Sequence, residues 1–208
     1  MKPIDKVIQF ALGEVGYKES PINITKYNDW ADTEGIWFTK VQGCSWCTTF
    51  IWYCIEKALS WKEYEFDLED FCVDSNCCWS DSWMNNFKYA GRFYMVDPQV
   101  GDLAFMKGHV GLVVATKQGY IETVEGNVAD SVQLKKRPYD SWLGFGRPAW
   151  ERVMEETIID SETQDALMWC INQGIYIGKD DGEMHWKDNL TREEMAIILY
   201  RYWMKFNR

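Results

Sequence analysis

The sequence predicts an α+β protein, with helices first along the chain and an antiparallel sheet after them. Apolar residues recur at helical spacing over residues 3–15 and again over residues 47–59. From residue 93 the pattern changes to short segments rich in β-branched and aromatic residues, with turn-forming residues between them. We therefore expect N-terminal helices that pack on a later antiparallel sheet.

Three helices are predicted before the sheet. The first begins with Pro3, whose fixed φ suits a first helical position, and it ends before Gly16. The second has an apolar side that includes Phe50 and Ile51. The third lies in SDSWMNNFKYAG, where a serine or aspartate caps the start and Gly91 closes the end.

The sheet is predicted from four short segments. They share β-branched or aromatic residues and are bounded by turn signals: RFYMV, DLAFM, HVGLVVAT and GYIETVEGN. The strand-rich part ends at LGFGRPAW, after which the chain becomes acidic and helical in pattern. This change predicts one domain over residues 1–150 and a small helical module over residues 151–208.

The charge of the chain excludes some partners. The 208 residues carry a net charge of −10 without a basic run, which disfavours nucleic acid and anionic membranes. No apolar run approaches the roughly 18 residues of a membrane span. Asp5 and Gln9 interrupt the region where a signal peptide would be apolar, so we expect synthesis in a cytoplasm.

Two of the seven cysteines, Cys44 and Cys47, form a C-x-x-C pair. Such a pair can be a redox couple, half of a zinc site, or a nucleophile beside a bystander. A redox couple of the thioredoxin type needs a βαβ context, whereas the strands here come later and are predicted antiparallel. A catalytic zinc takes three protein ligands, often histidines, and a structural zinc takes four, so with two separated histidines the site would need Cys44, Cys47 and the Cys77-Cys78 pair. That adjacent pair lacks the C-x-x-C spacing with which two thiolates bind one ion. These observations favour the nucleophile and predict no metal.

Cys47 is the better placed of the two sulfurs. It stands at the first turn of the predicted 47–59 helix, where unpaired backbone N–H groups and the helix dipole favour an anion such as a thiolate. A nucleophilic cysteine also needs a base beside it and a third group that orients the base.

A predicted hairpin supplies both partners. If a three-residue loop over residues 117–119 joins HVGLVVAT to YIETVEGN, His109 lies opposite Asn127 and Gly111 lies opposite Glu125. Histidine, asparagine and glutamate then share one face, and the carboxylate can orient the imidazole. A two-residue loop would place Glu125 on the other face. A histidine at a strand start is also often a surface or capping residue, so this register decides between the two interpretations.

The order of these motifs resembles that of the CHAP family, the cysteine, histidine-dependent amidohydrolases/peptidases. The resemblance rests on QGCSWCTTFIWYC, VGDLAFMKGHVGLVVA, YIETVEGN and GFGRPAW, and it is nearest to phage endolysins. It implies a papain-like fold and hydrolysis of an amide bond in peptidoglycan. It also implies Cys47 as nucleophile, His109 as base, Glu125 as the orienting carboxylate and Asn127 as an accompanying polar group. Gln42 either supports the oxyanion or is a loop residue.

Two features depart from what the resemblance implies. Cys44 matches no family chemistry, which favours a packing or loop role. Some members bind calcium through an acidic loop before the nucleophile, whereas ADTEG offers only Asp32 and Glu34 here. We therefore expect no cofactor and no required calcium.

The tail resembles a single S-layer homology (SLH) module. The resemblance includes Thr191, Arg192 and Glu193, and it implies binding of a secondary cell-wall polysaccharide. One copy would bind weakly unless a homo-oligomer supplied more copies. A helical hairpin that packs on the catalytic domain or on another subunit is the alternative.

These observations predict a peptidoglycan hydrolase of the endolysin type, either an N-acetylmuramoyl-L-alanine amidase or a stem or cross-bridge endopeptidase. Without a signal peptide it would stay in the host cytoplasm until a holin releases it to the wall. A non-catalytic wall-binding protein and a cysteine peptidase that acts on proteins are the rival functions.

Overall fold

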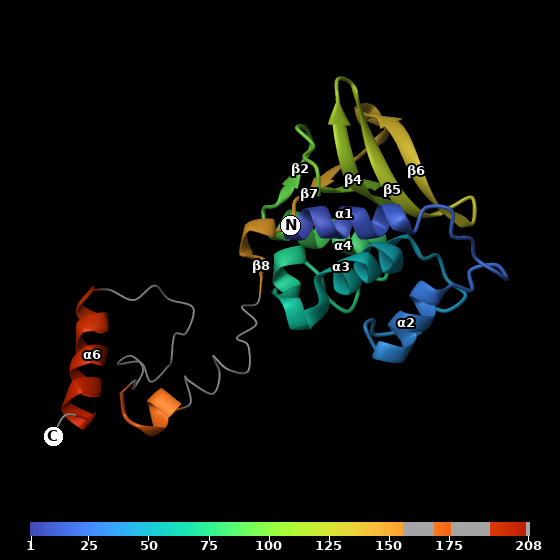
Figure 1. Ribbon diagram of the computed structural model, residues 1–208. Coiled ribbons are helices and arrows are strands. Elements are labelled where there is room, and N and C mark those ends of the chain that lie inside the picture. Colours follow the sequence, from blue (N-terminus) through green and yellow to red (C-terminus); the bar gives the residue numbers. More distant parts are fainter. Residues whose placement is uncertain (156–168, 176–191, 207–208) are drawn as a thin grey trace. The chain divides into compact units, whose positions relative to one another are not determined.

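The computed structural model describes residues 1–155, 169–175 and 192–206 (Figure 1). Contacts divide the chain into two compact units, Met1–Glu156 and Thr157–Arg208, which we describe separately. Among the described residues, no helix combines the length and the apolar character that crossing a bilayer requires.

The first unit extends beyond the predicted boundary at residue 150. The short helix η3 (Trp150–Arg152) and strand β8 (Met154–Glu155) belong to it, and β8 pairs with β1 (Tyr64–Glu65). The Trp150 indole donates a hydrogen bond to Gly101 O at 3.1 Å, and its ring packs 5.2 Å from that of Phe71. These contacts hold the end of the domain against its centre.

Helices and strands follow the predicted order, and the α+β class is confirmed. The helices of the first unit are α1 (Pro3–Gly13), α2 (Lys26–Glu34), α3 (Cys47–Glu63), η1 (Leu68–Phe71), α4 (Ser80–Tyr89) and η2 (Tyr139–Ser141). The strands of the large sheet are β2 (Phe93–Tyr94), β3 (Leu103–Met106), β4 (His109–Lys117), β5 (Tyr120–Val128), β6 (Ser131–Pro138) and β7 (Gly144–Gly146). They lie antiparallel in the order β2-β7-β3-β4-β5-β6.

Helix α2 was not predicted, because it has few apolar residues. Its two ends explain why it forms. The Thr25 side chain accepts a hydrogen bond from Asn28 N–H at the start, and Gly35 closes the end with a left-handed φ of 68°. The sequence of α2 therefore has the capping residues of a helix, Thr25 and Gly35, but lacks the apolar periodicity that identified the other helices.

The predicted hairpin loop between β4 and β5 is wrong, although the predicted register beyond it is right. Lys117 pairs with Tyr120, so the loop has two residues and not three. A β-bulge between Val113 and Ala115 then shifts the register by one residue and restores the predicted pairing of Val113 with Thr123. The bulge cancels the change of face that the shorter loop would cause, so Glu125 stays on the face of His109.

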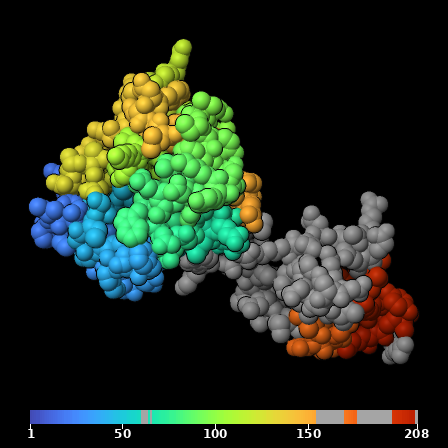
Figure 2. Space-filling view, turned by 180° about the vertical axis from the view of Figure 1, so that it is seen from behind, coloured from blue at the N-terminus to red at the C-terminus, as the bar shows by residue number. Residues whose placement is uncertain are grey.

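The two faces of the sheet have different coverings. The face toward the helices carries Leu103, Phe105, Val110, Leu112 and Val124, which join the main core with α1, α3 and α4. Figure 1 shows these helices stacked beneath the sheet. The segment of α4 and β2, green in Figure 2, forms much of the surface on the side seen there. The other face carries a smaller apolar cluster of Ala104, Val113, Ile121, Trp142 and Phe145.

The second unit is described only in part. Helix α6 (Arg192–Phe206) forms where a helix was predicted, and the Trp169 ring stacks on Phe206 with centroids 5.8 Å apart. Thr191 lies outside the described residues, as do the side chains of Arg192 and Glu193. Wall binding through these three residues therefore stays a prediction.

One close approach between helix and sheet yields a test of this packing. A Cβ on Gly126 would lie 2.6 Å from Phe50 Cβ on α3, which real side chains do not tolerate. We expect Gly126→Ala to lower the free energy of unfolding by about 1–3 kcal/mol, because overpacking forces the helix away from the sheet. Urea denaturation measures the change.

Gly13→Ala is the matched control, because a Cβ at Gly13 meets no atom within 4 Å. Alanine is the better helix former, so this variant should match the wild type or gain up to about 1 kcal/mol. Equal stability of Gly126→Ala and the wild type would contradict the close packing of α3 on β5.

Candidate active site

Cys47 is the first residue of α3 and is nearly buried. The helix begins there because Phe50 N–H bonds to Trp46 O at 2.9 Å, and Trp46 itself is held firmly. Its indole donates to Glu19 Oε2 at 2.6 Å and stacks on the Tyr27 ring at 5.3 Å. The sulfur thus stands beside the unpaired N–H groups of a fixed helix start, where an anion is favoured.

Helix α2 fixes the loop that leads to Cys47. Asn28 Nδ2 donates to Val41 O at 2.8 Å and to Cys44 O at 3.0 Å. Asp32 accepts hydrogen bonds from the N–H groups of Val41 and Gln42, at 2.7 and 3.1 Å. The Asp32 carboxylate therefore binds the backbone of the loop. The same loop carries Cys44, which is an exposed free thiol.

The side chain of Gln42 makes two hydrogen bonds that hold the same loop. Its Oε1 accepts from Thr25 N–H at 3.2 Å, and its Nε2 donates to Thr25 O at 3.3 Å. Both ends of the amide thus bind the backbone at the start of α2. This arrangement supports the loop interpretation of Gln42 over an oxyanion role.

His109 opens strand β4 and contacts both predicted partners. Its Nε2 donates to Glu125 Oε2 at 2.8 Å, which leaves the other ring nitrogen for the hydrogen bond with the Cys47 side chain. Burial lowers the pKa of His109, but the hydrogen bonds to Cys47 and Glu125 outweigh burial and raise it to about 9. These two contacts therefore favour the protonated imidazole at neutral pH.

Glu125 is fully buried and is surrounded by donors. Thr123 Oγ1 donates to Oε1 at 2.6 Å, while Arg137 donates from Nε to Oε1 and from Nη2 to Oε2, both at 2.8 Å. Burial raises the pKa of Glu125, but the bonds from Arg137, His109 and Thr123 outweigh burial and lower it to about 2. The carboxylate stays charged, and the bidentate Arg137 fixes its plane.

Arg137 was not predicted as part of this site. It lies on β6, where Ile121 pairs with Arg137 and Glu125 pairs with Gln133. Alternation along β6 places Arg137 on the same face as Thr123 and Glu125. Extending the predicted hairpin by one more strand would have revealed a cation on the face of the buried carboxylate.

Asn127 lies two residues after Glu125, but its side chain does not join the hydrogen bonds of the His109 ring. It has a left-handed φ of 60° at the register shift between Glu125 and Val128. Among the described residues, the His109 ring donates a hydrogen bond to Glu125 and shares one with the Cys47 side chain, and Asn127 is not a third partner.

Helix α4 secures the turn that precedes His109. Asp81 Oδ1 accepts a hydrogen bond from Gly108 N–H at 3.2 Å. Just before the helix, Cys78 O accepts from Thr48 Oγ1 at 2.9 Å, which ties the same segment to the first turn of α3. The loop before α4 therefore connects the nucleophile side of the site to the histidine side.

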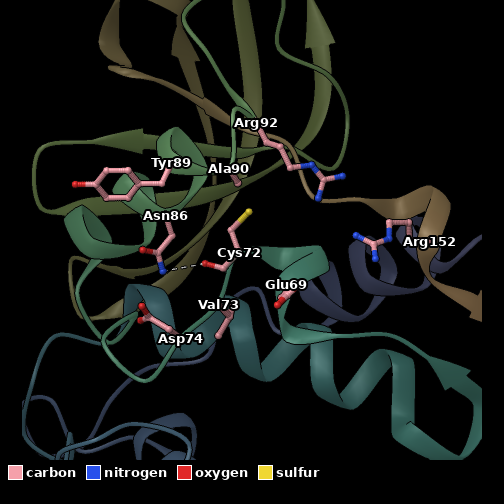
Figure 3. A pocket seen from close by; sticks show the side chains of 9 residues that line it. All are labelled: Glu69, Cys72, Val73, Asp74, Asn86, Tyr89, Ala90, Arg92 and Arg152. Atoms are coloured by element: carbon pink, nitrogen blue, oxygen red, sulfur yellow. Dashed lines mark hydrogen bonds between the residues drawn. The ribbon is translucent and has the colours of Figure 1, made fainter.

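A hollow of about 580 Å³ lies elsewhere in the first unit (Figure 3). Its walls include Cys72, Asn86, Arg92 and Arg152 but none of Cys47, His109 and Glu125. Both arginines are already paired, Arg92 with Glu151 and Arg152 with Asp70. The hollow is therefore a weaker candidate for chemistry than the cysteine–histidine contact.

The cysteines show no sign of a metal centre in the described part of the chain. All seven are free thiols. Within the residues that the structure describes, no three His, Cys, Asp or Glu side chains come together as metal ligands would.

Comparison with known proteins places the site in a family context. Residues 39–127 match the family model of the CHAP domain, and this segment contains Cys47, His109 and Glu125. The match supports a cysteine, histidine-dependent amidohydrolase or peptidase that acts on peptidoglycan. No curated protein and no solved structure matches the chain significantly.

The site predicts how stability depends on pH. The folded state raises the pKa of His109 from 6.5 to about 9, so it binds the proton more tightly than the unfolded chain. The stability from this proton is present below pH 6.5 and is lost as the pH rises through about 9. Glu125 has the opposite sign, because its stability is lost as the pH falls from 4.5 through about 2.

Urea unfolding at a series of pH values measures both effects. We expect the free energy of unfolding of the wild type to fall between pH 6.5 and about 9, relative to that of His109→Gln. Parallel curves for the two proteins over this window would contradict a protonated His109.

The Arg137 contact predicts a second change. Arg137→Gln leaves a buried carboxylate without its bidentate partner, so we expect a loss of about 2–3 kcal/mol in the free energy of unfolding. Lys135→Gln is the matched control, because Lys135 is on the same strand face and is not a partner of Glu125. An equal loss in the free energy of unfolding for both variants would contradict the stabilisation of buried Glu125 by Arg137.

Proposed function

We propose that this protein hydrolyses an amide bond of peptidoglycan through Cys47, His109 and Glu125. One observation supports the proposal most: a histidine joins the sulfur at a helix start to a buried carboxylate, inside the segment that matches the CHAP domain. Nucleophile, base and orienting group are the three parts that such catalysis needs.

The reaction follows from these contacts in two steps. The Cys47 thiolate attacks the amide carbonyl, and the tetrahedral intermediate places its oxyanion near the free N–H groups at the start of α3. His109 gives its proton to the leaving nitrogen, the C–N bond breaks and a thioester forms. Water then attacks the thioester as His109 takes a proton, which releases the acid and restores the thiolate.

Glu125 and Arg137 support this proton transfer without touching substrate. The carboxylate orients the imidazole and stabilises its charged form. Arg137 keeps the carboxylate ionised and fixed in plane, so the same ring nitrogen always faces the sulfur. In this proposal Asn127 and Gln42 shape the surrounding loops.

We propose the finer assignment of a phage endolysin, which the order of the sequence motifs supports. Such an enzyme would be held in the host cytoplasm and released to the wall at lysis. The second unit would then bind a wall polysaccharide or join subunits into a homo-oligomer, as the SLH-like motif suggests. A peptidase that acts on proteins, or a binding protein without activity, is the rival proposal.

Replacement of the nucleophile tests the reaction. Cys47→Ala should abolish the release of soluble fragments from purified cell walls while the protein still sediments with them, because only the attacking sulfur is removed. Turbidity of the wall suspension measures lysis, and a pull-down measures binding.

Cys44→Ser is the matched control, because Cys44 is an exposed thiol three residues away. It should lyse walls at the wild-type rate. Undiminished lysis by Cys47→Ala would overturn the mechanism, and activity on casein but not on walls would favour a peptidase of proteins.

A further inference from the structure

Two aromatic rings contact each other at the surface of the first unit. Phe38 and Trp79 are each 56% exposed, and their ring centroids lie 5.4 Å apart at 55°. Most of the other aromatic residues between α1 and α4 are buried or half-buried in the core. Two large apolar rings that contact each other in solvent suggest a ligand surface.

The residue that precedes each ring is hydrogen-bonded to the first turn of α3. Phe38 follows Trp37, whose indole donates to Thr49 Oγ1 at 3.3 Å. Trp79 follows Cys78, whose carbonyl accepts from Thr48 Oγ1 at 2.9 Å. Since Thr48 and Thr49 directly follow Cys47, the pair lies within a few residues' length of the sulfur.

Trp79 is tied to the histidine side of the site as well. It precedes Asp81 by two residues, and Asp81 binds the N–H of Gly108, the residue before His109. Trp79 therefore lies on the segment that bridges the two catalytic side chains.

Helix capping does not explain Trp79. It occupies the N-cap position of α4, and its side chain makes no capping hydrogen bond. Serine, threonine, aspartate and asparagine are the residues that stabilise this position. A tryptophan here gives up the cap and exposes its ring, which points to a role outside the fold.

We propose that Phe38 and Trp79 form a subsite for a sugar ring of the peptidoglycan glycan, next to the amide that Cys47 attacks. This inference rests on the proposed function. Stem peptides consist of small or charged residues, whereas a pyranose ring offers a flat C–H face of a size that suits an indole. The aromatic pair therefore matches the glycan better than the peptide.

The charges near the pair are balanced. Asp74 and Asp81 are exposed on the segment that carries Trp79, while Lys40 is exposed two residues from Phe38 and Lys107 on the turn before His109. The aromatic rings, and not a net charge, therefore carry the choice of a neutral sugar. A sugar on one side of the scissile amide makes the bond the one between the muramoyl lactyl group and L-alanine.

Binding by the inactive full chain tests the subsite. In a Cys47→Ala background, Trp79→Ser should weaken the binding of a disaccharide muramoyl-dipeptide about tenfold, a loss of the size found when an aromatic side chain that stacks on a nucleic-acid base is removed. Trp79→Phe should restore most of it. Serine supplies a good N-cap, so the change should not unfold α4.

Two comparisons make the result specific. Tyr89→Ser removes an 87%-exposed ring from the other end of α4 and should leave binding unchanged. A sugar-free stem peptide should bind equally to the Trp79→Ser and parent chains. The subsite is overturned if Trp79→Ser leaves muramoyl-dipeptide binding unchanged, or if it weakens the sugar-free peptide equally.

Mass spectrometry of walls digested by the active chain reports the bond. New L-alanine amino termini with intact glycan strands support the inference, and cuts within the stem peptide overturn it. Absence of any cleavage, together with Trp79-dependent sugar binding, would reject the proposed reaction but keep the subsite. The two proposals thus fail separately.

Discussion

The site depends on one buried carboxylate that is held between two cations. Glu125 has no exposed surface, yet Arg137 and His109 both bind it at 2.8 Å. A lone carboxylate would cost several kcal/mol in this position, so the three side chains are stable only as a set. The charge that Arg137 maintains on Glu125 acts together with Cys47 to raise the pKa of His109.

The rest of the fold supplies the positions of these groups. Antiparallel strands place His109, Glu125 and Arg137 on neighbouring strands of one sheet face, and the bulge in β4 keeps the glutamate on that face. The sheet's other face packs on α3, whose first residue is Cys47. The site therefore lies where the helix start meets the strand start, as a thiolate–imidazolium pair requires.

The sequence predicted the fold class, three helices and the residues that meet around His109, because each leaves a local pattern. It missed α2, which is held by its caps without an apolar stripe. The hairpin loop was assigned the wrong length, since a two-residue loop with a later bulge gives the same distal register. Arg137 was missed because no strand was predicted where β6 lies, so the hairpin was not extended to it. Gln42 was left open because only tertiary contacts show that its amide binds the backbone of Thr25.

The catalytic contact depends on the proton on His109, which NMR titration of the full chain measures directly. The protein has two histidines, so the imidazole signals are few and His109→Gln assigns them. We expect His109 to titrate near pH 9 and Cys47→Ala to lower this value, because the sulfur helps to hold the proton. A titration near 6.5 in both proteins would contradict the ion pair.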